Sequence, residues 1–349
     1  MREAEAFARY RGLIDDWPAF VDAIAKPLPT TLWTNTLRTS PEALAAELGA
    51  RVRPLAWLPG AFRAAPDFSP GRHWAYLAGL FQIQEEVSMA PIQLLGVQPG
   101  ERVLDLCAAP GNKTAQLAVR LQNHGRVVAN DRSIPRMRAC RQTFERLGLL
   151  NVATTIYDAR RFPPPTRRFD RVLVDAPCSG EGTCRKLAPR RWRSDPEASA
   201  RMARIQLQIL RHGVAHCRPG GRVIYSTCTF APEENECVVD ALLREGAPVR
   251  LLKVELPGLR TGAGLTRWAG RALHPELDRA LRLWPHHNDS GGFFIAVLER
   301  VEDAASTPRP QPSPEPLVEE REPWLSQLEQ RFGMSPASFE DYIPKRCSS

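Results

Sequence analysis

Six strand-like runs recur between residues 102 and 301, and helix-length segments separate most of them. The runs are rich in Val, Leu, Ile and Phe, as in "RVVAND" (126–131) and "FDRVLVDAP" (169–177). The other runs are 102–107, 152–157, 221–228 and 292–301. Strands that alternate with helices predict an α/β fold with a doubly wound, mostly parallel, Rossmann-like sheet. Ligands in such a sheet bind at the carboxyl ends of the strands.

The pattern changes near residue 90 and again after residue 302. Residues 1–90 mix helical spacing of apolar residues with a short strand over 31–37, which predicts a smaller α+β module. Ser40 as N-cap and Pro41 at the first helical position predict a helix start after that strand. Residues 91–302 hold the alternating pattern. Residues 303–316 are rich in Pro and Ser and predict a linker, and residues 317–349 predict a short C-terminal helical tail.

Composition places the chain among globular proteins with a sizeable core. Of its 349 residues, 43% are apolar and 25% are charged. The first residues lack the apolar core of a secretory signal, and no apolar run approaches the roughly 18 residues that span a bilayer. We therefore expect a cytoplasmic protein without a membrane partner, and a monomer is the default expectation.

Charge and cysteine content bear on partners. The net charge of +8 favours a polyanion such as nucleic acid, although a basic proteome produces such a balance without one. The eight cysteines form no Cys-x-x-Cys pair, and no histidines have zinc-ligand spacing. The sequence therefore predicts no metal site, and each cysteine is by default a small buried hydrophobe.

Acidic residues stand where successive predicted strands end. Asp131, Asp158 and Asp175 follow three of them, and "LDLCAAPGNKT" (104–114) supplies a small-residue loop. Each acid alone is commonly a helix N-cap. Together around one loop they suggest an adenosine-bearing ligand, with Asp131 accepting from ribose hydroxyls. A nicotinamide cofactor lacks its main signature because no G-x-G-x-x-G is present.

Two cysteines stand at the ends of the fourth and fifth predicted strands. Cys178 follows Asp175, and Cys228 closes "GRVIYSTC", immediately before a predicted helix start at Pro-Glu-Glu. Strands four and five are usually neighbours in this architecture, so both thiols are expected to face one cleft. Taken singly, each is more often structural. A metal pair or a redox disulfide is a further reading, which the spacing does not support.

These motifs resemble those of the Sun/Fmu family of S-adenosylmethionine-dependent RNA (cytosine-5) methyltransferases. "LDLCAAPGNKT" is similar to the family's cofactor loop, "VDAPCSGEGTCRK" to its Pro-Cys motif and "YSTCTFAPEENE" to its Thr-Cys motif. "RYRGLIDDWPAF" resembles the family's N-terminal module, which implies RNA binding by residues 1–90. Asn112 departs from the Gly or Ser usual in the family, and only a short piece follows the linker.

The resemblance implies a cofactor, a substrate and roles for individual residues. S-adenosyl-L-methionine would be held by Cys107, Ala108, Ala109, Pro110, Gly111, Asn112, Lys113, Asp131, Arg136, Asp158 and Asp175. Cys228 matches the family's nucleophile, Cys178 would assist product release as an acid/base group, and Asp175 would polarise the base. Lys113 is a supporting cation that can lower the pKa of the nucleophile. DNA cytosine methyltransferases use the Pro-Cys thiol instead, so the reverse assignment remains a rival.

The implied substrate is a cytosine in structured RNA, with ribosomal RNA the first expectation and transfer RNA the second. Two basic stretches, 159–168 and 184–193, can hold phosphates, although solvated loops have similar compositions. The second supplies the predicted RNA contacts Arg185, Lys186, Arg190, Arg191, Trp192 and Arg193. The alternatives are a catalytically silent RNA-binding or ribosome-assembly factor with this fold, and a nicotinamide oxidoreductase.

Overall fold

A computed structural model describes residues 5–165, 167–186 and 194–302. All of them belong to the first of two compact units, Met1–Asp303, and the second unit begins at Ala304. The predicted linker and C-terminal tail therefore lie outside the described residues. Among the helices that the structure describes, none is both long and apolar enough to cross a membrane.

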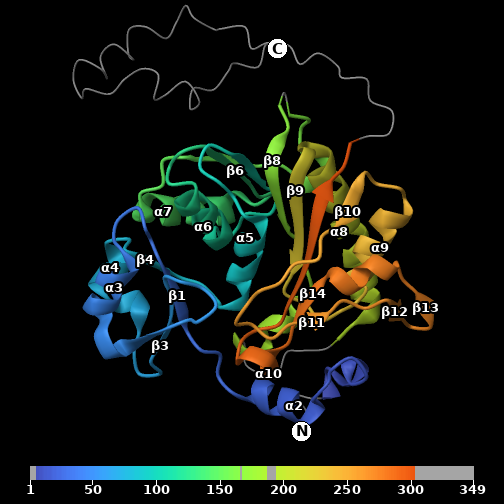
Figure 1. The fold of residues 1–349 in the computed structure, drawn as a ribbon, viewed down its shortest axis with the longest axis horizontal. Helices are drawn as coiled ribbons and strands as arrows, with labels where there is room; N and C mark the ends of the chain where they lie inside the picture. Colours follow the sequence, from blue (N-terminus) through green and yellow to red (C-terminus); the bar gives the residue numbers. More distant parts are fainter. Residues whose placement is uncertain (1–4, 166, 187–193, 303–349) are drawn as a thin grey trace, which may run out of the picture. The chain divides into compact units, whose positions relative to one another are not determined.

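The larger sheet has nine strands and a mostly parallel centre (Figure 1). Its order is β11-β14-β15-β9-β8-β5-β6-β7, and β10 also pairs with β15. The parallel strands are β5 (Arg102–Asp105), β6 (Arg126–Asn130), β7 (Val152–Thr155), β8 (Phe169–Asp175) and β9 (Cys217–Thr227). The antiparallel side comprises β10 (Val249–Leu251), β11 (Gly262–Ala263), β14 (Leu281–Leu283) and β15 (Phe293–Arg300).

Helices cover both faces of this sheet (Figure 1). One face packs against α8 (Pro196–His216) and α9 (Glu236–Arg244), through residues such as Leu104, Val172 and Ile209. The other face packs against α5 (Ala90–Leu95) and α6 (Asn112–Arg120), with α7 (Ile134–Leu147) beside α6. Because both faces are covered, the central residues of the buried strands are apolar on both sides of the sheet, as in Val172–Val174 of β8. The predicted α/β, doubly wound fold is confirmed.

A second, antiparallel sheet comes from the first 90 residues. Its order is β2 (Val52–Pro54), β3 (Ala61–Ala64), β1 (Thr31–Thr34) and β4 (Phe81–Ile83). The helices of this region are α2 (Trp17–Ala25), α3 (Pro41–Leu48) and α4 (Trp74–Leu77). The α3 helix begins as the sequence predicts, because Ser40 Oγ accepts from the Ala43 amide at 3.1 Å and Pro41 follows.

The second sheet is tied to the larger domain by specific hydrogen bonds. The Asn35 side chain donates to the carbonyls of Gly79 and Leu147, each at 2.8 Å, and the Arg146 guanidinium donates to Gln82. These contacts help to explain why β1 ends at Thr34 although residues 31–37 were predicted as one strand. Asn35 turns inward to satisfy two backbone carbonyls, so the strand pattern stops there.

Three short elements complete the described part of the fold. The strands β12 (Arg267–Trp268) and β13 (Arg271–Ala272) form a small hairpin, and α10 (Pro285–Asn288) precedes β15. The helix predicted directly after Cys228 is wrong in its position. Residues 232–235 instead form hydrogen-bonded turns, and α9 begins at Glu236.

Candidate active site

A cavity of about 430 Å³ opens at the carboxyl ends of β5, β6, β8 and β9. The position is expected, since β5 lies between β6 and β8 and the strand order reverses there. The volume lies in the usual range for small-molecule sites. Of the predicted cofactor and catalytic residues, those that line the cavity are Cys107, Ala108, Ala109, Pro110, Asn112, Lys113, Asp131, Arg136, Asp158, Asp175, Cys178 and Cys228.

The loop after β5 is held from both sides. Asp105 accepts from Thr114 Oγ1 at 2.7 Å, which connects the strand end to the first turn of α6. Burial raises the pKa of the Asp105 carboxyl to about 7. Gly111 stands before α6 with φ 99°, and a Cβ there would meet the Cys140 and Phe144 side chains at 3.1–3.2 Å. Glycine is therefore required at this turn.

Asn112, the departure from the family pattern, has a contact of its own. Its Oδ1 accepts from Gln82 Nε2 at 2.7 Å, and Gln82 lies on β4 of the second sheet. The residue thus connects the loop above the cavity to the N-terminal sheet.

The acid after β6 lies beside a basic partner. Asp131 is 5% exposed, and Arg136 Nη1 lies 3.3 Å from its Oδ2. Arg136 Nη2 also donates to the Ala109 carbonyl at 2.6 Å, so one guanidinium joins the two loops. Asp158, after β7, accepts from Arg160 Nε at 3.0 Å, and that hydrogen bond lowers the pKa of its carboxyl to about 2.

The end of β8 carries an ion pair. Lys113 Nζ lies 2.7 Å from Asp175 Oδ2, and Ser226 Oγ donates to Oδ1 at 2.8 Å. Burial opposes the charge on Lys113, but Asp175 outweighs it, and the pKa of Lys113 is raised. The ammonium also lies over the Phe293 ring, 5.0 Å from its centroid. Lys113 is therefore a fixed cation inside the cavity.

The two sulfur atoms meet, as expected from adjacent strand ends. Cys178 Sγ lies 3.4 Å from Cys228 Sγ. Their hydrogen bond lowers the pKa of the Cys228 thiol, and the charges of Lys113 and Lys186 lower it further, against burial and Asp175. The same bond raises the pKa of Cys178 well above its ordinary value, and burial and Glu234 act in the same direction. The environment thus favours a thiolate on Cys228 and a thiol on Cys178.

Sequence reasoning missed the residues that hold the Cys178 loop. Glu234, fully buried, accepts from the Ser179 amide at 3.0 Å and from Gln206 Nε2 at 2.9 Å. Gln206 Nε2 also donates to the Pro177 carbonyl at 2.8 Å. Gln206 lies on α8, far along the chain, and its sequence context gives no signal for this contact. The acid-rich "PEENE" segment belongs to the Thr-Cys motif, but the motif predicts no role for Glu234.

Two glycines beside the sulfurs were also missed. The Gly182 amide donates to the Cys228 carbonyl at 2.8 Å, and the Gly292 amide donates to Gly182 at 2.9 Å. A Cβ on Gly182 would lie 2.2 Å from the Gly292 carbonyl oxygen. Both glycines therefore allow three backbone segments to approach closely around Cys228.

The predicted RNA contacts have different positions. Lys186 is exposed and lines the cavity. Arg185 is buried, with a side chain 1% exposed, and donates to the carbonyls of Lys26, Pro27 and Ser290 and to Asp289. Its guanidinium is committed to the fold, so we do not include it in an RNA surface. Arg190, Arg191, Trp192 and Arg193 lie outside the described residues.

A cluster with metal-ligand atom types lies outside the cavity. The Nε2 atoms of His286 and His287 are 2.8 and 3.0 Å from Asp15 Oδ1. Arg260 Nη2 also donates to Asp15 Oδ2 at 2.7 Å, so the carboxylate already has a cationic partner. Sequence spacing could not find this cluster, because Asp15 is more than 270 residues away from either histidine.

Comparison with known proteins identifies the family. The family model for the 16S rRNA methyltransferase RsmB/F matches residues 92–299, which hold the cavity and both cysteine motifs. The chain belongs to this family. The predicted resemblance to the Sun/Fmu group is thereby confirmed. A solved methyltransferase homologue from Pyrococcus horikoshii has the same fold, with TM-score 0.72 and 33% identity over 82% of this chain and 91% of that one.

Curated relatives of this RsmB/F family member have several RNA substrates in their names. A 28S rRNA (cytosine-C(5))-methyltransferase of Mus musculus is 36% identical over 83% of this chain. Ribosomal RNA small subunit methyltransferase F of Erwinia tasmaniensis is 37% identical over 85% of it. The chain spans only 37% and 62% of those proteins. A tRNA (cytosine(49)-C(5))-methyltransferase of Pyrococcus abyssi is 34% identical over 82% of this chain and 93% of its own length.

Proposed function

We propose that this protein transfers a methyl group from S-adenosyl-L-methionine to carbon 5 of a cytosine in RNA through a covalent cysteine adduct. The observation that supports this most is the contact of two unlike thiols, 3.4 Å apart, beside the Lys113–Asp175 pair in a cavity. The names of the relatives favour ribosomal RNA first and transfer RNA second as the substrate.

The residues around the cavity fit the proposed cofactor. Small residues in the loop Cys107–Gly111 leave backbone accessible, which suits close contact with a methionine moiety. Asp131 and Asp158 offer carboxylate oxygens to ribose hydroxyls and an adenine amino group, respectively. When bound, S-adenosylmethionine supplies an electrophilic methyl group. Arg136 would hold the Ala109 backbone and the Asp131 carboxylate in fixed positions beside the cofactor.

Cys228 is the nucleophile that attacks the cytosine. Its thiolate forms a bond to carbon 6 of the cytosine, and the electron pair of the 5,6 double bond makes carbon 5 nucleophilic. The positive charge on Lys113 favours the thiolate before attack. Asp175 keeps that ammonium in place through its contact of 2.7 Å, so the pair polarises the base together.

Product release uses Cys178. After methylation the carbon–sulfur bond to Cys228 must break, and carbon 5 must lose its proton. The Cys178 thiol gives its proton to the departing sulfur, and the resulting thiolate takes the proton from carbon 5. The double bond re-forms, Cys178 is again a thiol, and Cys228 regains its thiolate by loss of a proton to solvent. Glu234 disfavours a resting thiolate on Cys178 and so helps to keep the two roles separate.

The RNA strand must present an unstacked cytosine, because carbon 6 is inaccessible inside a helix. Lys186 at the cavity is the described candidate for a phosphate contact. Residues 190–193 and the N-terminal module remain proposed RNA contacts.

The test is methyl incorporation from labelled S-adenosylmethionine into bulk RNA. We expect Cys228→Ala to lower incorporation by roughly 10³-fold or more, because no other group replaces the nucleophile. Cys237→Ala removes a half-buried thiol outside the cavity, so it is the matched control and should retain activity.

Cys178→Ala should accumulate a protein–RNA adduct on denaturing gels. An adduct with Cys228→Ala instead would reverse the two roles, and RNA binding without incorporation by the wild type would favour the silent assembly factor.

A further inference from the structure

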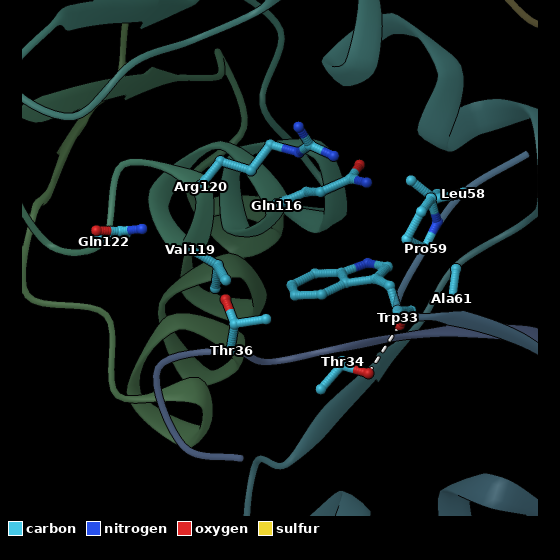
Figure 2. Close-up of a pocket in the computed structure, with 11 residues that line it drawn as sticks. Trp33, Thr34, Thr36, Leu58, Pro59, Ala61, Gln116, Val119, Arg120 and Gln122 are labelled. Atoms are coloured by element: carbon cyan, nitrogen blue, oxygen red, sulfur yellow. Dashed lines mark hydrogen bonds between the residues drawn. The ribbon is translucent and has the colours of Figure 1, made fainter. Parts of the chain in front are cut away.

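A second cavity, of about 270 Å³, lies between the N-terminal sheet and α6. Figure 2 shows Trp33 and Thr34 from β1 on one side and Gln116, Val119 and Arg120 from α6 on the other. None of its lining residues lines the candidate active site. The cavity is therefore separate from the proposed cofactor and substrate positions.

Arg120 brings a cation to this cavity. The side chain is half-buried, and within the residues that the structure describes it has no hydrogen-bond or ion-pair partner. Burial alone lowers the pKa of its guanidinium. A guanidinium nevertheless keeps its charge, and even partial desolvation of a charge without a counter-ion has a cost. An anion supplied from outside the chain would remove that cost.

Gln116 places an unsatisfied amide next to the cation. The residue is 4% exposed, and its Oε1 has no hydrogen-bond partner among the described residues. Because Gln116 and Arg120 are four positions apart on one helix, they share a face, and Figure 2 shows them extending side by side. The unsatisfied Oε1 can accept from a ribose hydroxyl, whereas the Nε2 of the same amide can donate to a phosphate oxygen.

The rest of the cavity mixes apolar side chains with the polar side chains of Thr34, Thr36 and Gln122. Trp33 Nε1 donates to Gln84 Oε1 at 2.9 Å, which holds the indole ring in place below the two polar groups. Thr34 Oγ1 donates to the Gly60 carbonyl at 2.7 Å, which holds the lining segment 58–61 against β1. Leu58 and Val119 add aliphatic surface. A ligand with one anionic end and a less polar body fits these groups best.

We propose that this cavity binds the phosphate of a ribonucleotide, with Arg120 as the partner of the anion and Gln116 as the second polar contact. A guanidinium matches phosphate because two of its N–H groups can donate to two oxygens. The phosphate can come from an RNA strand or from a free nucleotide, since the recognising chemistry is the same. In an RNA-binding protein such a site would anchor the substrate away from the reacting base.

The experiment is binding to the full chain at constant ionic strength in chloride. Inorganic phosphate, CMP and a short single-stranded oligoribonucleotide are titrated against wild type, Arg120→Gln and Arg138→Gln. Arg138 is an exposed arginine on α7, outside both cavities, and controls for the loss of one charge. We expect about tenfold weaker CMP binding in Arg120→Gln, as for loss of a charge-assisted hydrogen bond, and a change within about twofold in Arg138→Gln.

Two further measurements separate the outcomes. A loss of oligoribonucleotide affinity in Arg120→Gln identifies RNA as the source of the phosphate, whereas a loss for CMP and phosphate alone identifies a free nucleotide. A photoreactive oligoribonucleotide cross-linked to wild type should map to 33–36 or 58–61 in the first case. Equal CMP affinity in wild type and Arg120→Gln, or equal losses in both variants, overturns the proposal. None of these readouts depends on methyl transfer, so failure of the proposed function is a separate result.

Discussion

The two ends of α6 carry cations in opposite situations. At the first turn, Lys113 is 13% exposed and lies 2.7 Å from Asp175. At the last residue, Arg120 is half-buried and has no partner among the described residues. One helix thus serves two cavities, and only one of its buried charges is balanced by the fold itself. A balanced cation can shape the reactivity of its neighbours, whereas an unbalanced one is suited to a ligand.

The difference extends to what each cation does to its surroundings. Lys113 lowers the pKa of Cys228 and is held over Phe293, so its position is determined before any substrate arrives. The pKa of Arg120 is lowered by burial alone, without a contribution from a neighbouring charge. We therefore expect substitutions at the first turn to change chemistry and substitutions at the last to change binding.

The largest effect is expected for Lys113→Gln. Removing the ammonium raises the pKa of Cys228 and leaves Asp175 without its cation, so kcat for methyl transfer should fall by roughly 10²–10³-fold. The pH profile of Cys228 alkylation by iodoacetamide should move to higher pH. Lys186→Gln is the matched control for the alkylation profile alone, since Lys186 is exposed and lowers the pKa of Cys228 less. An unchanged alkylation profile in Lys113→Gln would show that the thiolate does not depend on this cation.

A second prediction concerns Asp105, a buried acid near this pair that has no cation within hydrogen-bonding distance among the residues the structure describes. Its folded-state pKa of about 7 exceeds the unfolded value near 4, so the folded protein holds the proton more tightly. The stabilisation from this group is present below about pH 4 and is lost as pH rises through 7. In Asp105→Asn this pH dependence should disappear.

The measurement is denaturant unfolding of both proteins at pH 4 and pH 6. Relative to Asp105→Asn, the wild type should lose about 2 kcal/mol of unfolding free energy between these values. A difference that stays constant with pH would mean that the folded-state pKa of Asp105 equals its unfolded value, so burial does not hold the proton there.

The sequence predicts correctly which residues lie at the carboxyl ends of the parallel strands. Asp131, Asp158, Asp175 and the two thiols were placed correctly at one cavity, because parallel strands bring their carboxyl ends together. It failed where burial decides the role of a residue. Arg185 lies in a basic stretch, yet its guanidinium donates hydrogen bonds to backbone carbonyls of two distant loops.

The same limit explains the contacts that were missed altogether. Gln206 from α8 and Glu234 from the turns before α9 form a hydrogen bond beside the Cys178 loop. No spacing in the chain predicts this contact. Arg120 looks like an ordinary helix-ending cation in sequence. Its lack of a partner depends on where the N-terminal sheet packs, which is a property of the tertiary structure.

The smallest effect is expected for Arg120→Met, measured by denaturant unfolding without phosphate. Because the substitution removes a partly desolvated charge that no described group balances, stability should stay constant or rise by up to about 1 kcal/mol. Lys113→Met is the matched contrast and should lose about 2 kcal/mol or more, since Asp175 is left without its cation. In the wild type, CMP should raise the unfolding temperature, and in Arg120→Met this increase should disappear. If Arg120→Met instead loses as much stability as Lys113→Met, the Arg120 guanidinium is balanced within the chain, and the contrast between the two ends of α6 fails.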